Sequence, residues 1–386
     1  MRVLRVATVV TRFEAGAGVV ALRGARSLDP DRYQVSIIAG SGDRLLEEAA
    51  DAGLDVIVEP SLRAPISPRD DLRALGRLTE VIGREGYDLV HTHSAKAGAI
   101  GRLAAHRAGV PRIVHTFHGF PFHEFQSAAR RSAYVHIERR LGRFTDVALC
   151  VGTNVAVEAI RRRLVAPERI RTIGVTVDVT APVRTPASTA RARAALGLPV
   201  GVPVVGAVGR LAYQKAPEDF VAAMVALNRP GVRGVWIGGG ELAEKVRRLA
   251  EKATAGVTFV GERANVPELL PAFDVFALPS RYEGLPVAIV EAMVCGIPVV
   301  ATAVNAVSDV VVPGETGLLV RPEDPRQLAA ALAYLLDNPA AAARMAGAAK
   351  ARLGERHTGH SLADVLVEAY AAGRSRVHSI KEPTCA

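Results

Sequence analysis

The chain has 386 residues, of which 49% are hydrophobic and 23% charged, and its formal net charge is +9. This length exceeds what one hydrophobic core usually organises, so we expect two globular domains. The three cysteines are too widely separated for a disulfide framework and fit a reducing compartment. No run reaches the ~18 uninterrupted apolar residues that a spanning helix needs, so the composition favours a cytoplasmic protein.

Short Val- and Ile-rich runs alternate with Ala-, Leu- and Arg-rich segments through the first half of the chain. Near-continuous apolar strands separated by helices are typical of parallel sheets that are covered on both faces. The N-terminal run MRVLRVATVV lacks the long apolar region and cleavage site of a signal peptide, so we interpret it as the first strand. The pattern predicts strands at 3–9, 33–38, 55–58, 88–91, 112–116, 147–151 and 171–173, with helices such as 71–84 and 97–108 between them.

A Pro-rich segment separates this half from a second series of strands. Residues 179–203 are interpreted as a linker that carries one short helix. The strand pattern then restarts at VVGAVG and continues through GVWIGGG, GVTFVG, DVFALP, IPVVAT and TGLLV. We therefore predict an α/β fold with two doubly wound Rossmann-like domains that face each other across a cleft. The predicted parts are a first domain at 1–178, the linker at 179–203, a second domain at 204–358, a helix at 359–374 that returns to the first domain, and a disordered tail at 375–386.

Basic residues cluster at 129–143 and 160–164. They are either solvated helix faces or an electrostatic surface for an anionic lipid or a phosphorylated substrate. These runs lack interleaved aromatic residues, and no nucleic-acid-binding motif accompanies them. We therefore expect no nucleic acid partner.

Ligands of doubly wound sheets bind beyond the carboxyl ends of the strands, where several motifs of this chain lie. In VVGAVGRLAYQK, Arg210 and Lys215 follow a predicted strand. Two cations there could clamp a diphosphate and stabilise a departing phosphate, or they could belong to a solvated basic turn.

In VWIGGGELAEKV, Gly239 and its neighbours lie between a strand and a helix, where a ligand could approach the backbone closely. The turn around Arg263 could line a base pocket.

The stretch SRYEGLPVAIVEAMVCG places two glutamates around a Gly-Leu-Pro turn. Pro286 and Gly296 suit the start and end of a helix, so we predict a short buried helix between them. The free N–H groups near Gly284 and Leu285 could bind phosphate. A carboxylate at Glu291, inside an apolar helix, needs a partner, and the vicinal hydroxyls of a ribose would serve. Glu283 would then face the sugar end of the same ligand. Alternatively, one glutamate lies on the surface and the other pairs with an arginine.

In the first half, Gly16 and Gly18 follow the first strand but do not complete a GxGxxG fingerprint. This disfavours a dinucleotide enzyme. Several histidines lie at strand ends, and their spacing matches no metal signature, so no metal is expected. Buried or rim histidines are the default interpretation, with one exception: His118, next to a glycine at a strand's carboxyl end, could hydrogen-bond a sugar hydroxyl across the cleft.

Together, GRLAYQK, SRYEGLPVAIVEAMVCGIPVVAT and HTFHGFPFH resemble the retaining glycosyltransferases of family 4, which have the GT-B architecture. The resemblance extends from the first strand to about Leu353. The segment THSAKAGAIGRLAAHRAGVPRIVHTFHGFPFH is most similar to members that build bacterial polysaccharides or glycolipids.

The resemblance implies a role for each matching residue. Arg210 and Lys215 would hold the diphosphate of a UDP-sugar, Glu291 the ribose, and Glu283 the donor sugar. The backbone at Gly284 and Leu285 would seat sugar and phosphate, His118 would contact the donor sugar, and the loop with Gly16 and Gly18 would approach phosphate and acceptor. It further implies a hexose of the glucose or N-acetylglucosamine type, a hydroxyl acceptor, and no cofactor or metal. Three departures from the usual pattern, Gly16-Ala17-Gly18, Lys215-Ala216 and the sequence VTVD at 175–178, suggest a divergent member with an unusual acceptor.

The acceptor remains open between a polyprenyl-linked glycan of the cell envelope and a small metabolite of an antibiotic-type pathway. The basic runs favour the former and allow peripheral contact with the inner face of an anionic membrane. A UDP-sugar epimerase on the same architecture is a further alternative. A non-catalytic sugar-nucleotide-binding protein is disfavoured, because the set Arg210, Lys215, Glu283 and Glu291 is intact.

Overall fold

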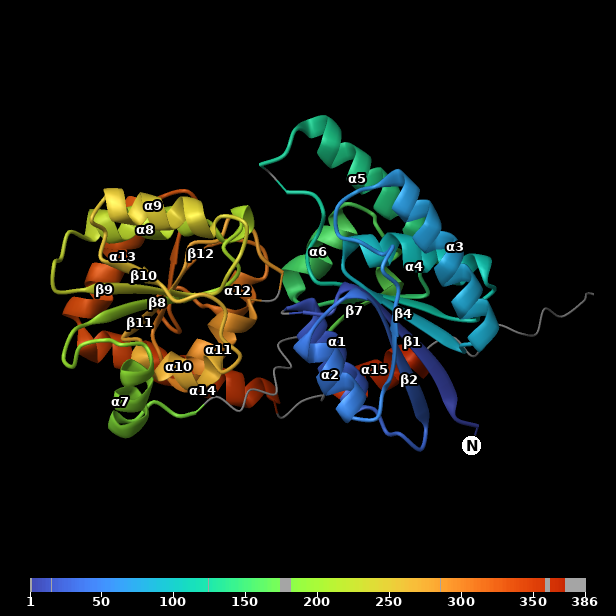
Figure 1. The fold of residues 1–386 in the computed structure, drawn as a ribbon, viewed down its shortest axis with the longest axis horizontal. Coiled ribbons are helices and arrows are strands. Elements are labelled where there is room, and N and C mark those ends of the chain that lie inside the picture. The colour runs from blue at the N-terminus through green and yellow to red at the C-terminus, as the bar shows by residue number, and fades with distance from the viewer. Residues whose placement is uncertain are drawn as a thin grey trace, which may run out of the picture. The chain divides into compact units, whose positions relative to one another are not determined.

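The computed structural model describes residues 2–14, 16–123, 125–173, 182–284, 286–357 and 362–371. The chain forms two compact units (Figure 1). The first comprises Met1–Val151, Val155–Gly174 and His360–Ala386, and the second comprises Gly152–Asn154 and Val175–Gly359. Each unit is an α/β fold built on one parallel sheet, so the predicted pair of Rossmann-like domains is confirmed.

The first sheet has seven parallel strands in the order β3-β2-β1-β4-β5-β6-β7. The chain reverses its direction of winding at β1, which is the switch point of a doubly wound sheet. The strands are β1 (Leu4–Arg12), β2 (Tyr33–Ser41), β3 (Asp55–Val58), β4 (Leu89–His93), β5 (Ile113–Phe117), β6 (Val147–Cys150) and β7 (Ile170–Thr172).

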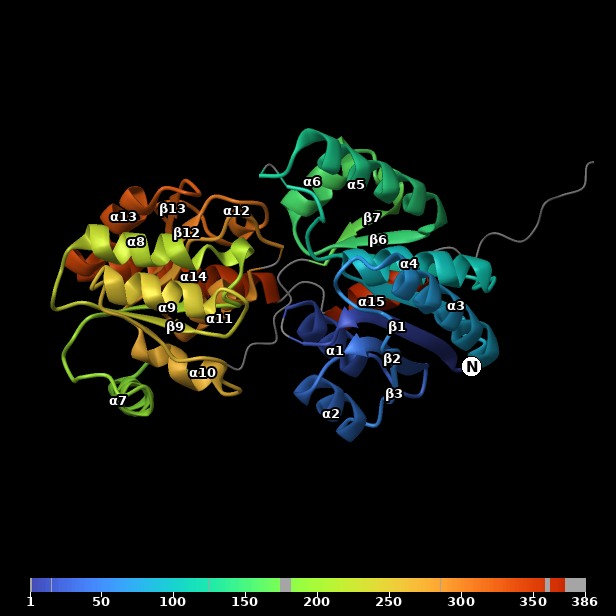
Figure 2. The ribbon, with the colours of Figure 1, turned by 45° about the horizontal axis from the view of Figure 1, so that its top comes forward.

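Alternate residues of these strands pack into two separate hydrophobic cores, because successive side chains point to opposite faces of the sheet. On one face, Val6 and Val10 pack with α1 (Ala17–Ser27), α2 (Arg44–Asp51) and α15 (Leu362–Ala371). On the other face, Ala7 and Val9 pack with α3 (Pro68–Glu85) and α4 (Ala95–Arg107) (Figure 2). The unit also contains α5 (Ala128–Leu141), α6 (Thr153–Arg161) and the short helices η1 (Gly142–Phe144) and η2 (Pro167–Arg169).

The second sheet has six parallel strands in the order β10-β9-β8-β11-β12-β13. They are β8 (Val204–Val208), β9 (Arg233–Ile237), β10 (Val257–Phe259), β11 (Val275–Leu278), β12 (Val299–Thr302) and β13 (Leu318–Val320). Its switch point lies between β8 and β11, so the chain segments that follow these two strands start from the same edge of the sheet.

Helices cover both faces of this sheet as well. Helices α8 (Pro217–Leu227), α9 (Ala243–Lys252) and α13 (Pro325–Asp337) pack on one face. Helices α11 (Val287–Cys295) and α14 (Pro339–His357) contribute to the other core (Figure 1). The shorter elements are α10 (Val266–Leu269), α12 (Val307–Val310), η3 (Tyr213–Lys215) and η4 (Leu270–Ala272).

Helix α7 (Pro186–Ala195) forms within the segment that we interpreted as a linker, and it belongs to the second unit. Its N-terminus has a capping box, in which Thr185 and Ser188 satisfy each other's backbone N–H groups. Arg193 on this helix and Arg184 before it both pair with Asp274, at 2.7 and 2.5 Å. Residues 182–203 are therefore attached to the second unit by specific contacts.

Candidate active site

The structure brings together Lys215 and Glu283, which follow the neighbouring strands β8 and β11. Lys215 Nζ donates to Glu283 Oε1 at 2.5 Å, across 68 positions of sequence. The glutamate side chain is 3% exposed and the lysine side chain 17%. The result is an ion pair largely removed from water at the carboxyl edge of the second sheet.

Three further groups orient Glu283. Ser280 Oγ donates to Oε1 at 2.5 Å and Gln214 Nε2 to Oε2 at 3.4 Å. The backbone N–H of Glu283 donates to Asn305 Oδ1 at 3.3 Å. We did not identify these three residues from the sequence. Ser280 and Gln214 could have been found because they lie within four residues of predicted site residues at strand ends, whereas Asn305 gives no comparable signal.

The loop that carries Lys215 is shaped by two small residues. Ala216 ends the short helix η3 in the left-handed region, at φ 48°, where a side chain is disfavoured by about 1–2 kcal/mol. The lysine chain then crosses Gly209, where an added Cβ would lie 3.2 Å from Lys215 Cε. Gly209 therefore permits the path by which Lys215 reaches Glu283.

Arg210 and Arg263 are not part of this ion pair. Arg210 is exposed, and its nearest acidic partner is Glu241, 3.8 Å away. Arg263 is also exposed and donates to the backbone oxygen of Glu262 at 3.1 Å. Neither arginine has a fixed, buried geometry, so their predicted ligand contacts stay predictions.

The glycine run 238–240 has a structural explanation. Leu211 N donates to Gly239 O at 2.6 Å, so the turns after β8 and β9 lie against each other. A Cβ on Gly238 would approach Gly209 O to 2.2 Å, and one on Gly240 would approach Leu211 O to 2.5 Å. These two glycines are needed for backbone packing, while the predicted ligand contact of Gly239 stays untested.

Helix α11 spans Val287–Cys295, as the Pro and Gly signals predicted. Pro286 occupies the N-cap position, and Gly296 ends the helix at φ 85°. Glu291 is half-buried on this helix, and Gly284 is half-buried just before it. Leu285 lies outside the described residues.

In the first unit, Gly16 is the N-cap of α1 at φ 54°, a conformation that favours glycine. A Cβ on Gly18 would lie 2.9 Å from the carbonyl carbon of Phe13, so this glycine lets α1 start close to the end of β1. His118 comes directly after β5, and its ring contacts His93 at the end of β4. Within the described ranges, no group of three or more His, Cys, Asp and Glu residues is arranged to hold a metal ion.

Two Rossmann-like units, each built on a doubly wound parallel sheet, form the architecture of the GT-B class of glycosyltransferases. A solved structure of Anabaena HepE in complex with UDP and glucose has the same fold, with a TM-score of 0.81 at 21% identity over 95% of this chain and 98% of that one. Residues 15–181 match the family described as Glycosyltransferase Family 4, and residues 188–352 match Glycosyl transferases group 1. The chain belongs to glycosyltransferase family 4, so the predicted family is confirmed.

Two curated relatives extend this comparison. An Escherichia coli UDP-Gal:alpha-D-GlcNAc-diphosphoundecaprenol alpha-1,3-galactosyltransferase is 30% identical over 331 residues, which cover 84% of this chain and 85% of that protein. A D-inositol 3-phosphate glycosyltransferase of Thermobispora bispora is 32% identical over 94% of this chain and 91% of that protein. The two relatives act on acceptors of different kinds, so family membership alone does not define the acceptor.

Proposed function

We propose that this glycosyltransferase moves a hexose of the glucose or N-acetylglucosamine type from a UDP-sugar to a hydroxyl acceptor, with retention of configuration and without a metal. The observation that carries the proposal is the Lys215–Glu283 pair at the carboxyl edge of the second sheet, immediately before α11. A cation, a carboxylate and a helix N-terminus there supply groups for a phosphate and for a sugar hydroxyl at adjacent positions.

In the proposed mechanism, Lys215 and Arg210 hold the diphosphate, and Glu291 accepts hydrogen bonds from the ribose hydroxyls. Glu283 accepts a hydrogen bond from the sugar, and His118 contacts the sugar as the family resemblance implies. Because UDP departs with its negative charge increased, the two cations and the dipole of α11 stabilise the transition state more than the ground state.

The reaction breaks the bond from the anomeric carbon to the β-phosphate oxygen and forms a bond from that carbon to the acceptor oxygen on the same face. The acceptor hydroxyl loses its proton to the departing phosphate oxygen. This route needs no protein base, and the buried carboxylate of Glu283 already accepts hydrogen bonds from Lys215 and Ser280.

We propose that the acceptor is a lipid-linked glycan of the cell envelope, reached from the cytoplasmic side. Exposed arginines on and after α5, namely Arg130, Arg139, Arg140 and Arg143, support binding to an anionic membrane surface. None of the helices in the described part of the chain combines the length and apolar composition needed to cross a bilayer. The E. coli relative, whose name specifies a polyprenyl-linked acceptor, supports the same choice.

The test is UDP release from a panel of UDP-sugars, with either a lipid extract or a water-soluble metabolite extract as the source of acceptor. We expect release to be stimulated by the lipid extract. Stimulation by the soluble extract alone would indicate small-molecule glycosylation instead. Release of UDP from UDP-N-acetylglucosamine without any acceptor would indicate an epimerase.

A further inference from the structure

His93 and His118 form a direct contact at the carboxyl edge of the first sheet. His93 is the last residue of β4, His118 is the first residue after β5, and these strands are parallel neighbours. His93 Nδ1 and His118 Nε2 lie 2.9 Å apart, with the ring centroids separated by 5.2 Å. A hydrogen bond joins the two rings, so one of them must donate to the other.

Both rings are neutral at pH 7. Burial holds the pKa of His93 well below its usual value and lowers the pKa of His118 to about 4. Two neutral imidazoles carry one N–H each, so whichever ring donates in this contact has its other nitrogen unprotonated.

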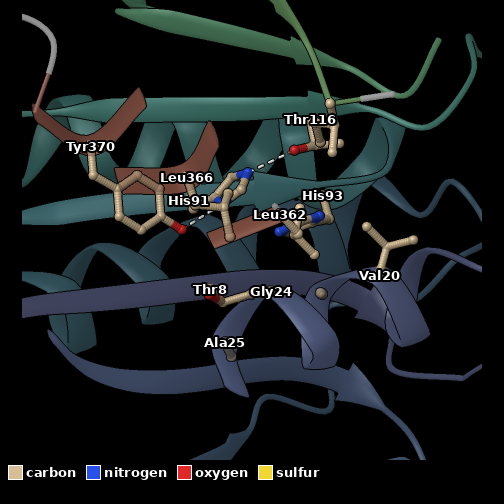
Figure 3. A pocket seen from close by; sticks show the side chains of 12 residues that line it. Thr8, Val20, Gly24, Ala25, His91, His93, Thr116, Leu362, Leu366 and Tyr370 are labelled. Atoms are coloured by element: carbon tan, nitrogen blue, oxygen red, sulfur yellow. Dashed lines mark hydrogen bonds between the residues drawn. The ribbon is translucent and has the colours of Figure 1, made fainter. Parts of the chain in front are cut away.

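The surroundings of His93 decide which of the two rings donates the hydrogen bond. His93 is 3% exposed, and its Nε2 has no hydrogen-bond partner among the described residues. His93 also lines a small pocket whose other residues include Thr8, His91, Thr116 and Tyr370 (Figure 3). A proton on Nε2 would be a buried donor without a protein acceptor, which costs more than a buried lone pair. The proton of His93 therefore belongs on Nδ1.

A second layer of contacts holds the ring of His93 in place. The ring of His91 lies 4.1 Å from it, centroid to centroid. His91 is itself fixed at both nitrogens, by Tyr370 Oη of α15 at 2.8 Å and by Thr116 Oγ1 at 2.7 Å (Figure 3). Because His91 cannot turn without breaking these bonds, it presents a fixed surface to the ring of His93.

We propose that His93 is a positioning residue that donates from Nδ1 to His118 Nε2 and thereby fixes His118 in the tautomer with its proton on Nδ1. His118 then offers an N–H donor, rather than a lone pair, to an oxygen of the donor sugar. This step rests on the proposed function, because it takes from there the contact between His118 and the sugar. The proposal gives His93 a role in the reaction, and no sequence motif indicates this role.

The test compares three variants with the wild-type chain. His93→Leu removes the donor to His118, whereas the side-chain amide of His93→Asn can still donate from a position near Nδ1. His115→Leu is the matched control, because His115 is equally buried on β5 but bonds to Thr92 and not to His118. We expect kcat for UDP-sugar consumption to fall about tenfold or more in His93→Leu, and less than about threefold in His93→Asn and in His115→Leu. The Kd of UDP should not change, because the proposed UDP contacts lie in the second unit.

The tautomer is measured separately, by 15N NMR of histidine-labelled wild-type protein with His118 assigned through loss of its signal in His118→Gln. A proton on Nδ1 of His118 supports the proposal, and a proton on Nε2 overturns it. Unchanged kcat in a folded His93→Leu variant overturns it as well. If the wild-type chain uses no UDP-sugar, the proposed function fails, and the NMR measurement still decides which nitrogen of His118 carries the proton.

Discussion

At the scale of single residues, two of the groups proposed to bind the donor contact each other. Lys215, the proposed partner of a phosphate, forms an ion pair with Glu283, the proposed partner of a sugar hydroxyl. In the proposed mechanism, a bound donor replaces this contact with two new ones. Ser280 and Gln214 remain as partners of Glu283 during the exchange, so the carboxylate does not become an isolated buried charge.

We predict that Lys215→Ala lowers kcat/KM for the UDP-sugar by about 10²–10³, because it removes a charge that acts on the departing phosphate. Glu291→Ala is expected to act mainly on donor affinity and to raise KM. Both are measured by initial rates of UDP release over a range of donor concentrations. Circular dichroism spectra should match those of the wild-type protein.

Lys245→Ala is the control for both variants, because Lys245 is an exposed lysine of α9 in the same unit. It should leave kcat/KM within about twofold, as surface substitutions usually do. Wild-type rates in Lys215→Ala or in Glu291→Ala would contradict the assignment of the donor site.

The types of residue in this site could be predicted from the sequence, but their pairing could not. Glycines, cations and carboxylates after apolar runs indicate positions at strand ends, and the order of strands places those ends on one edge. That Lys215 contacts Glu283, while Arg210 lies apart from the pair, depends on the paths of side chains through the loops. For Gly238 and Gly240 the residue type was recognised but its cause was not. The sequence pattern suggested a ligand contact, whereas close packing against the backbone explains both glycines.

At the scale of elements, helices α4 and α5 are joined by a buried ion pair. Arg102 Nη2 donates to Glu138 Oε2 at 2.7 Å, and the two side chains are 0% and 3% exposed. Arg102 also donates to Gly98 O at 2.6 Å and to Thr145 Oγ1 at 3.4 Å. The guanidinium is therefore fully surrounded by protein, and its charge has one acidic partner in this contact.

We predict that Glu138→Ala lowers the free energy of unfolding by about 3–5 kcal/mol, since it leaves the arginine buried without its counter-charge. The double variant Arg102→Met with Glu138→Leu should recover most of that loss. Urea denaturation checks both expectations. Glu244→Ala, which removes two exposed ion pairs on α9, should change the free energy by less than about 1 kcal/mol. A loss no larger in Glu138→Ala than in Glu244→Ala would show that the buried pair contributes little.

Elements were easier to predict from the sequence than their ends. Every predicted strand corresponds to a strand of the structure, because buried parallel strands are short apolar runs between turns. The first strand nevertheless runs to Arg12 instead of residue 9, since its polar end pairs with β2 through Arg12 and Ser41. Composition indicated a linker with one short helix at 179–203, and helix α7 lies there, although which unit it packs on could not be read from its prolines and small residues.

At the scale of the whole molecule, the first unit contains four histidines that burial keeps neutral, and this makes its stability depend on pH. Burial lowers the pKa of His91 to about 3 and of His118 to about 4, and it holds those of His93 and His115 well below the usual value. Neighbouring charges act in the same direction, chiefly Arg102 on His115 and the histidines on one another. In the unfolded chain these groups titrate near pH 6.5.

The direction in which the free energy of unfolding changes with pH follows from proton uptake. Above pH 6.5 the histidines are neutral in both states, and as the pH falls towards 4 the unfolded chain binds protons that the folded chain does not. We therefore predict that the free energy of unfolding decreases from pH 7 to pH 5, by up to about 2 kcal/mol for each histidine. Asp219 in the second unit has the opposite effect on the dependence of stability on pH. Burial raises its pKa to about 6, although the attraction of Arg281 acts to lower it.

Urea denaturation of the Asp219→Asn variant at several pH values isolates the contribution of the histidines. Adding His115→Asn to that variant should make the dependence on pH shallower. An equal slope with and without His115 would contradict the prediction.

Helix α15 has a consequence for how the protein is made. Leu366, Ala369 and Tyr370 complete the core of the first unit, yet they are translated after the whole of the second unit. At roughly 5–20 residues per second, the ribosome needs on the order of 10–40 s to pass through the second unit. During that time the growing chain carries a first unit whose core lacks its closing helix. The part synthesised first is thus the last to finish folding, and the nascent chain exposes an apolar surface that chaperones would have to shield until residue 371 has emerged.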